Sequence, residues 1–346
     1  MLKGINQAQP VQPTEPAPPD EATWEPLPET ESSPFTFADG TAEATCQRVY
    51  ERASAILALA KECLPPLRFS PSAKGPAEVP GLALILCHHG HDPARVSAGF
   101  AALGITLQST PAPTRMILVE AAREGDKRYF DHVPGVDYLA VTVTEQSKDI
   151  WLKEALWSKA AREALASDAA ITKLVFLDID CSYVDPSWLA YTSCALDRAE
   201  VVSPHAWMYY SGQPDGTRFA LRESAGYALA KGSTYGFPGM AIAMTREFFL
   251  NRLEGRLPNL STGGGDSYLW LQLAGNKRFA LDRFTFSHSL TRQQVAGLQP
   301  RPVTGHAGQI VVHHPHGPLD NRCYRQRNIL ARACASALGE ELSYLP

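Results

Sequence analysis

Short apolar runs alternate with polar stretches along the middle of the chain, and several of these runs end in charged residues. In order they read GLALILCHHG, RMILVEAARE, DYLAVTVTE and ITKLVFLDID, and helix-like segments pass through Phe100 and Leu103 and through Trp151 and Leu156. Runs that are apolar on both faces and alternate with helices predict an open α/β sheet, mostly parallel, with flanking helices. Ligands of such sheets bind at the C-terminal ends of the strands.

The alternation continues in the second half of the chain. It predicts a helix and a strand over SWLAYTSCALDRAEVVSPHAWMYY, a strand after YGFPGM, a helix after LSTGGGD and a last strand in IVVHH. Gly236 and Gly239 allow the backbone to pass close to a ligand. We therefore place the core of the domain at residues 79–275, and we expect residues 276–346 to complete the site at the sheet edge.

The N-terminal part has a different composition. Residues 1–40 are rich in Pro, Glu and Thr and carry seven acidic residues against Lys3 alone. Such a segment buries too little apolar surface to offset the entropy of ordering, so we expect a disordered tail. Apolar residues recur at helical spacing from Val49 to Leu64, which predicts one amphipathic helix and a linker over residues 41–78.

The location of the protein is predicted from what the chain lacks. No apolar run approaches the length that spans a bilayer, and the N-terminus has no apolar stretch of a secretory signal, so we expect a cytoplasmic protein. The seven cysteines are an odd number without a CxxC pair, which argues against a disulfide framework and a structural zinc site.

The chemistry begins at Asp178 and Asp180, which stand one residue apart at the C-terminal end of a predicted buried strand. Because strand side chains alternate, residues two apart point to the same side, and the two carboxylates would converge. Like charges repel at that range, and a divalent cation with oxygen ligands relieves the repulsion. The alternative is that one aspartate caps the next helix while the other is solvated.

A third carboxylate, Asp266, follows three glycines at the start of an apolar helix. One interpretation is that Asp266 is only the N-cap of that helix, where the helix dipole stabilises an anion. The other is a general base, because a carboxylate on a sterically bare loop can approach an acceptor hydroxyl and take its proton.

The C-terminal segment is basic and rich in histidine. His313, His314 and His316 crowd the end of the last predicted strand, and imidazole is a common ligand of transition metals. Between residues 277 and 332, nine Lys and Arg residues stand against two Asp. Such a segment suits a polyanionic ligand, although a solvated basic face is the alternative.

The order of these motifs resembles the GT-A class of nucleotide-sugar glycosyltransferases, and within it a group found in bacteriophages and viral metagenomes. The resemblance runs from about residue 82 to 332 and departs from the group at Pro315, where an aromatic residue is common. The motifs are Val119-Glu120, Trp151 with Lys153-Glu154, Asp178-Ile179-Asp180, Gly236 to Gly239, Gly264-Gly265-Asp266, His316-Gly317, Asn321-Arg322 and Tyr324 to Arg327.

The resemblance implies a role for each matching residue. Asp178 and Asp180 would hold Mn²⁺ or Mg²⁺ against the diphosphate of a nucleotide sugar, most simply a UDP-sugar, with His316, or else His313 or His314, as a third ligand. Asp266 would be the base of an inverting transfer. Glu120 would contact the nucleoside. The other donor-binding residues would be Lys153, Gly239, Gly265, Arg322, Arg325 and Arg327.

The resemblance also suggests an acceptor, namely hydroxymethylated pyrimidines such as 5-hydroxymethylcytosine in double-stranded phage DNA, with the enzyme in the host cytoplasm. The base would leave the stack, and Trp207, Tyr209 and Tyr210 would receive it. The alternative is that these aromatic residues belong to the ordinary core and that the basic stretch binds the donor phosphates. The alternative acceptors are a saccharide, a lipid carrier or a protein. Two other classes are a metal-dependent hydrolase and a noncatalytic DNA-binding module.

Overall fold

The computed structural model describes residues 78–90, 93–143, 151–211, 219–233, 236–258, 263–275 and 303–314. The predicted tail, nearly all of the predicted helix and linker of residues 41–78, and most of the basic segment lie outside these ranges. None of the helices in the described ranges is long and apolar enough to cross a membrane.

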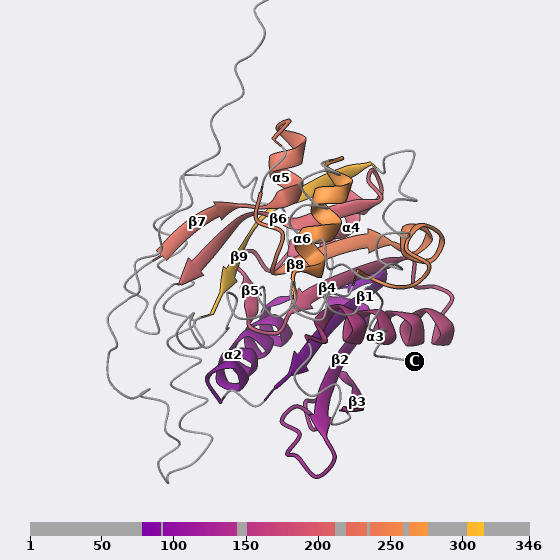
Figure 1. Ribbon diagram of the computed structural model, residues 1–346, viewed down its shortest axis with the longest axis vertical. Coiled ribbons are helices and arrows are strands. Elements are labelled where there is room, and N and C mark those ends of the chain that lie inside the picture. Colours follow the sequence, from indigo (N-terminus) through magenta and orange to yellow (C-terminus); the bar gives the residue numbers. More distant parts are fainter. Residues whose placement is uncertain are drawn as a thin grey trace, which may run out of the picture. The chain divides into compact units, whose positions relative to one another are not determined.

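A mixed sheet forms the centre of the described part of the chain (Figure 1). Its strands lie in the order β3-β2-β1-β4-β8-β6-β9-β5, and β7 pairs with β6. The strands are β1 (Glu78–His89), β2 (Ala112–Arg123), β3 (Asp137–Val143), β4 (Lys173–Asp178), β5 (Cys181–Tyr183), β6 (Val201–Ser211), β7 (Phe219–Glu223), β8 (Ala241–Thr245) and β9 (Thr304–His313). The helices are α2 (Pro93–Ser109), α3 (Lys153–Ser167), α4 (Trp188–Leu196), α5 (Ala225–Ala230), the π-helix η1 (Phe248–Arg252) and α6 (Gly265–Leu273).

Most of these strands run in one direction. Strands β1 to β4 are parallel to one another, β8 is antiparallel to both β4 and β6, and β9 is parallel to β6. Only β5, β7 and β8 therefore oppose the rest among the described strands. This confirms the predicted α/β architecture with a mostly parallel central sheet and flanking helices.

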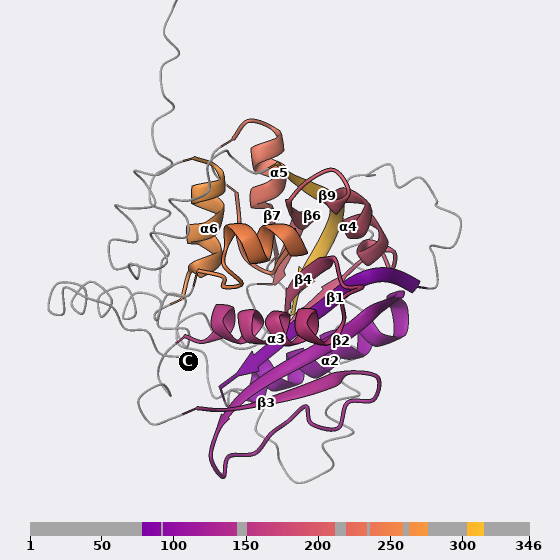
Figure 2. The same ribbon diagram turned by 90° about the vertical axis from the view of Figure 1, so that its right-hand side faces the viewer.

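Both faces of the sheet are covered, which explains why its strands are apolar throughout. In β1, Ala83, Ile85 and Cys87 pack into a core beneath α3, η1 and α6, whereas Leu82, Leu84 and Leu86 pack into a second core beneath α2 and α4. Figure 2 shows α3 in front of β1 and β2 and α2 behind them. Each face alone gives a stripe of alternate residues, so the two stripes together produce the continuous apolar runs of the sequence.

The C-terminal segment contributes a strand to this sheet, next to β5 at the end of the strand order. Strand β9 lies between β6 and β5, and its last residue, His313, pairs in register with Cys181. This register places the end of β9 directly beside the chain that follows Asp178 and Asp180. A residue of the basic segment, His313, thus lies next to residues of the predicted core at the C-terminal end of β9.

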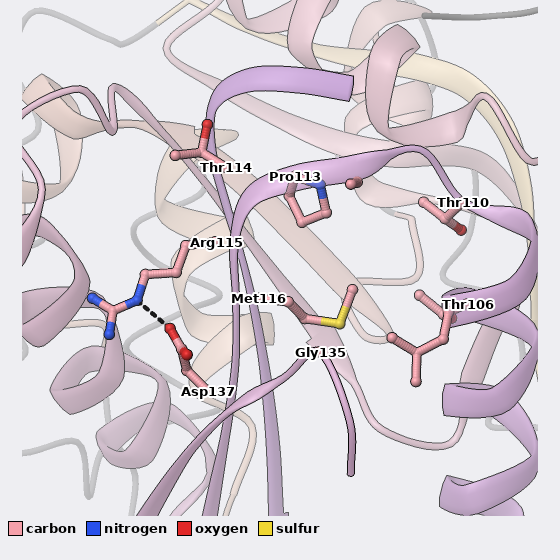
Figure 3. Close-up of a pocket in the computed structure, with 10 residues that line it drawn as sticks. Thr106, Thr110, Pro113, Thr114, Arg115, Met116, Gly135 and Asp137 are labelled. Carbon is pink, nitrogen blue, oxygen red and sulfur yellow. Dashed lines mark hydrogen bonds and ion pairs between the residues drawn. The ribbon is translucent and has the colours of Figure 1, made fainter. Parts of the chain in front are cut away.

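A small cavity of about 240 Å³ lies at the opposite edge, between the end of α2 and the starts of β2 and β3 (Figure 3). Arg115 and Asp137, which line it, form an ion pair of 2.5 Å. Because β2, β3 and β4 are parallel, this cavity is at the far end of the sheet from Asp178.

Candidate active site

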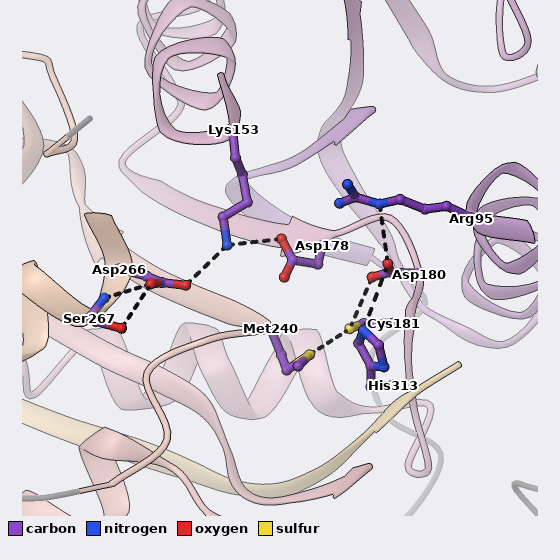
Figure 4. Close-up of polar contacts among 9 residues, drawn as sticks. All are labelled: Arg95, Lys153, Asp178, Asp180, Cys181, Met240, Asp266, Ser267 and His313. Atoms are coloured by element: carbon purple, nitrogen blue, oxygen red, sulfur yellow. Dashed lines mark hydrogen bonds and ion pairs between the residues drawn. The ribbon is translucent and has the colours of Figure 1, made fainter. Parts of the chain in front are cut away.

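The ends of β4, α3, α6 and β9 bring a set of charged side chains together (Figure 4). Asp178 is the last residue of β4, in register with Cys87 of β1, and its backbone N–H donates to Met240 O at 2.8 Å. The strand therefore delivers this carboxylate to the C-terminal edge of the sheet, where α/β folds bind ligands.

Lys153, the first residue of α3, lies between two carboxylates. Its Nζ is 3.3 Å from Asp178 Oδ1 and donates a hydrogen bond of 3.1 Å to Asp266 Oδ2. The Lys153 side chain is only 5% exposed and lies 4.8 Å from the centre of the Trp157 ring. One buried ammonium thus joins the DxD segment to the start of α6.

Burial and charge oppose one another at these groups. Burial lowers the pKa of Lys153, but the charges of Asp178 and Asp266 outweigh this effect, so the pKa lies well above its usual value. The pKa of Asp178 is raised, first by burial and then by the charge of Asp180, against the opposing effect of Lys153. The ammonium is therefore firmly charged, and Asp178 is a buried acid with a second carboxylate nearby.

Asp180 has different partners from Asp178. Its carboxylate is 3.4 Å from Arg95 Nε, in the first turn of α2, and 3.8 Å from His313 Nε2. We expected the two carboxylates to converge because side chains alternate along a strand. That reason is wrong, since β4 ends at Asp178 and Asp180 follows in a turn. The two remain close enough for Asp180 to raise the pKa of Asp178, but each reaches a cation from a helix on a different face of the sheet.

The described histidines have separate environments. His314 is buried, its Nε2 lies 2.8 Å from Ser182 Oγ, and burial lowers its pKa to about 4. Its side chain is thus held within the fold, while His313 lies beside Asp180. His316, the ligand suggested by the resemblance, lies outside the described residues together with Arg322, Arg325 and Arg327.

A divalent cation fits this donor set in its chemistry. Two carboxylates that lie near one another and an adjacent imidazole suit Mn²⁺ or Mg²⁺. Within the described ranges, no three Asp, Glu, His or Cys side chains are arranged around one such point, and Lys153 and Arg95 face the aspartates. Asp178 and Asp180 would hold the ion, with His313 or the predicted His316 beside them.

Asp266 is in the first turn of α6, but it is not the N-cap. Gly264 occupies that position with a φ of 91°, a conformation that favours glycine. Asp266 Oδ1 accepts hydrogen bonds from Ser267, at 2.6 Å from its backbone N and 3.3 Å from its Oγ. The capping alternative is therefore wrong, and Oδ2 is the oxygen directed at Lys153.

Glu154 adds a buried acid that the sequence did not mark as a site residue in its own right. It is 2% exposed, and neither carboxylate oxygen accepts a hydrogen bond from another described residue. Burial raises its pKa to about 7, while Lys153 lowers it and Asp266 raises it. A Cβ at Gly265 would lie 3.0 Å from Glu154 Cδ and would collide with Pro258 O, so close packing accounts for this glycine.

The segment before β8 passes close to the same carboxylates. A Cβ on Gly239 would lie 3.6 Å from Asp266 Oδ2, and Met240 has a φ of 79°, which is unusual for a residue with a side chain. Met240 Sδ is 3.3 Å from Cys181 Sγ, next to Asp180. Strained backbone of this kind occurs frequently at functional sites.

Glu120 is engaged inside the protein. It is 1% exposed, and its carboxylate accepts hydrogen bonds from the backbone N–H groups of Tyr129 and Phe130 and from Tyr138 Oη at 2.7 Å. The carboxylate therefore anchors the loop that follows β2. Its predicted contact with a nucleoside stays a prediction.

The aromatic residues proposed to receive an acceptor are not equivalent. Tyr209 is only 6% exposed and belongs to the buried set, whereas Trp207 is half-buried and lies 5.5 Å from the ring of Tyr227. Of Tyr210 only the backbone is described. Trp207 is thus the remaining aromatic candidate whose side chain the structure places at a partly open position.

Arg95 was missed by the sequence reasoning. The available signal was its place, two residues after a proline at the start of a helix that follows the C-terminal end of a buried strand. An arginine at this position points toward the ligand-binding edge of an α/β sheet.

Comparisons with known proteins add only distant similarity. No family model matches the chain, and no curated protein matches it. One similar solved structure is the mannosyltransferase PcManGT from Pyrobaculum calidifontis in complex with GDP-Man and Mn²⁺, with 17% identity, 87% of this chain and 76% of that chain covered, and a TM-score of 0.42. Another is glucosyl-3-phosphoglycerate synthase from Mycobacterium tuberculosis in complex with Mn²⁺, UDP and phosphoglyceric acid, with 16% identity, coverage of 76% and 80%, and a TM-score of 0.39. At such low identities and TM-scores, these proteins' activities and ligands do not carry over to this chain.

Proposed function

We propose that the chain is a metal-dependent glycosyltransferase of the GT-A type that moves a sugar, with inversion, from a nucleoside diphosphate to an acceptor hydroxyl. One observation carries the proposal: Asp178 and Asp266 face a single ammonium, that of Lys153, at the C-terminal edge of the sheet. A carboxylate pair of this kind supports two separate tasks, one on the leaving-group side and one at the acceptor.

The leaving-group side of the reaction needs positive charge. As the bond between the anomeric carbon and the diphosphate oxygen breaks, negative charge grows on the diphosphate and positive charge on the sugar. A divalent cation bound by Asp178 and Asp180 would neutralise the diphosphate. Arg95 and Lys153 are the described cations that face these aspartates, and either would pair with a phosphate oxygen.

The acceptor side needs a base. We assign this role to Asp266, whose Oδ2 lies beside Gly239 and accepts a hydrogen bond from Lys153. Asp266 would take the hydroxyl proton as the acceptor oxygen attacks the anomeric carbon, and the electron pair of the broken bond would leave with the diphosphate. Its other oxygen, held by Ser267, fixes the orientation of the carboxylate.

The donor and acceptor are the finer parts of the proposal. We propose a UDP-sugar as donor and 5-hydroxymethylcytosine or 5-hydroxymethyluracil in double-stranded DNA as acceptor. The half-buried Trp207 supports an aromatic platform, and the basic composition of residues 277–332 supports a polyanionic ligand. A saccharide, lipid carrier or protein acceptor is the alternative.

The test is mass spectrometry of products after incubation with Mn²⁺ and a panel of nucleotide sugars. The acceptors are DNA containing either hydroxymethylated base, unmodified DNA, and a set of glycans. Asp266→Asn is compared with Asp137→Asn, a matched change at the opposite edge of the sheet. We expect a sugar added to one acceptor by the parent and by Asp137→Asn, and not by Asp266→Asn.

The competing classes give different results in the same assay. A hydrolase would release product with metal and no acceptor. A noncatalytic DNA-binding protein would form no product, and its DNA affinity would be unchanged by Asp178→Asn. If the release of nucleoside diphosphate depends on a glycan and not on DNA, the chain is still a glycosyltransferase, but its acceptor is a saccharide.

A further inference from the structure

The site contains its own cations next to the oxygens that a metal ion would use. Lys153 Nζ is 3.3 Å from Asp178 Oδ1, and Arg95 Nε is 3.4 Å from Asp180 Oδ2. All four side chains are strongly buried, with exposed fractions of 5% and 13% for the first pair and 14% and 2% for the second. Such buried charges are tolerated only when each has a partner.

We propose that Lys153 and Arg95 are positioning residues that act as resident counter-cations of Asp178 and Asp180. As a result, a divalent cation binds weakly by itself and tightly only together with a nucleoside diphosphate. The role of the diphosphate rests on the proposed glycosyltransferase function, whereas the competition between these side chains and a cation does not.

The reason is electrostatic. A dication at Asp178 and Asp180 would stand within a few ångströms of an ammonium and a guanidinium, in a buried place where screening by water is weak. The repulsion falls when an anion arrives that both side chains can hold. A diphosphate is such an anion, because it presents several oxygens to a metal ion and to basic side chains at the same time.

If the Lys153 side chain turns toward the diphosphate, its movement also releases the proposed base, Asp266. Lys153 Nζ also holds Asp266 Oδ2, and it lies between Asp266 and Asp178, where the transferring sugar must fit between base and leaving group. When Lys153 turns to the diphosphate, Oδ2 becomes free to accept the proton of the acceptor. Donor binding and release of the base are then one event, which keeps Asp266 blocked while no donor is bound.

The experiment measures binding of Mn²⁺ alone, by electron paramagnetic resonance of the free ion, to the parent, Lys153→Met and Arg95→Met. Methionine keeps much of the length and the apolar contact of both side chains without the charge. Arg115→Met is the matched control, because Arg115 pairs with Asp137 at the opposite edge. Thermal unfolding of each variant checks that it folds cooperatively.

We expect Lys153→Met and Arg95→Met each to tighten Mn²⁺ binding by about 5- to 150-fold, the usual range of coupling between sites, and Arg115→Met to change nothing. Adding UDP or GDP should tighten Mn²⁺ binding strongly in the parent and much less in the two variants. An unchanged or weaker affinity for Mn²⁺ in both folded variants would overturn the proposal.

Arg95→Met keeps the test decisive if Lys153→Met does not fold, because it leaves the contacts of Lys153 with Asp178 and Asp266 in place. The two proposals also fail separately. If no nucleoside diphosphate binds the parent, but Mn²⁺ alone binds more tightly to the variants, the counter-cations are supported and the glycosyltransferase function is overturned. If the parent and both variants bind Mn²⁺ alone with equal affinity, while UDP or GDP still binds the parent, the counter-cation proposal is overturned and the glycosyltransferase function stands.

Discussion

Lys153 Nζ donates a 3.1 Å hydrogen bond to Asp266 Oδ2 across 113 positions of sequence, and it thereby joins the first residue of α3 to the first turn of α6. This contact links the carboxylate that we assign as the base to the carboxylate that ends β4. It also means that two carboxylates of the site, Asp178 and Asp266, share one buried cation.

Replacing that cation should therefore destabilise the fold. We expect Lys153→Met to lower the free energy of unfolding by about 3–5 kcal/mol, the usual cost of leaving buried charge uncompensated. Urea unfolding measures the loss. In the double variant with Asp178→Asn part of it should be recovered, and a loss that is purely additive in the double variant would contradict the pairing.

The pH dependence of stability should reveal Glu154. Its pKa is raised from 4.5 to about 7, so the folded state holds the proton more tightly than the unfolded state does. Relative to Glu154→Gln, the parent therefore has its full stability below pH 4.5 and loses it as the pH rises through 7. The loss amounts to about 3 kcal/mol.

Urea unfolding of the parent and of Glu154→Gln at intervals between pH 4 and 9 measures this difference. Because Lys153, Asp178 and Asp266 are present in both proteins, the difference between the two curves reports the titration of Glu154 together with its effect on these neighbours. Parallel curves over the whole range would show that Glu154 is not buried in the way the structure describes.

Gly265 should not tolerate a side chain. A Cβ there would collide with Pro258 O and press on Glu154, so Gly265→Ala should destabilise the protein by about 1–3 kcal/mol, as overpacked sites do. Gly305→Ala is the matched control, because its nearest atoms would be at an ordinary 3.7 Å. Thermal unfolding compares them, and equal melting temperatures would contradict the packing at the start of α6.

A variant of Glu120 can distinguish a structural role of this carboxylate from a contact with the ligand. Glu120→Gln weakens the charge-assisted bonds to the backbone of Tyr129 and Phe130 and should cost about 1–3 kcal/mol of stability. Hydrogen exchange of the loop after β2 should rise in the variant. If stability and exchange stay unchanged while nucleotide affinity falls, Glu120 acts on the ligand rather than on the loop.

The strands around the site were predictable because both of their faces are buried. In β1, apolar residues on each face make a run that only a covered strand explains, and the same holds for β4 up to Asp178. The short β5 escaped prediction, since three residues of a strand leave no periodic signal and β5 exists only through its pairing with β9.

The site was predictable in its residue types and not in its pairings. The sequence indicated Asp178, Asp180 and Asp266 from their places at a strand end and a helix start. It did not indicate that Asp180 faces Arg95 while Asp178 faces Lys153. Those pairings depend on which helix covers which face of the sheet, and local propensities do not encode this arrangement.

The most direct measurement pairs donor affinity with transfer rate for Asp178→Asn and Asp266→Asn, at saturating Mn²⁺ and with the acceptor found in the product assay. Our account predicts that Asp266→Asn binds the nucleoside diphosphate at least as tightly as the parent but transfers sugar about 10² to 10⁴ times more slowly, as expected for loss of a general base. It predicts that Asp178→Asn loses both. Unimpaired transfer by Asp266→Asn, or unimpaired metal-dependent donor binding by Asp178→Asn, would contradict the account.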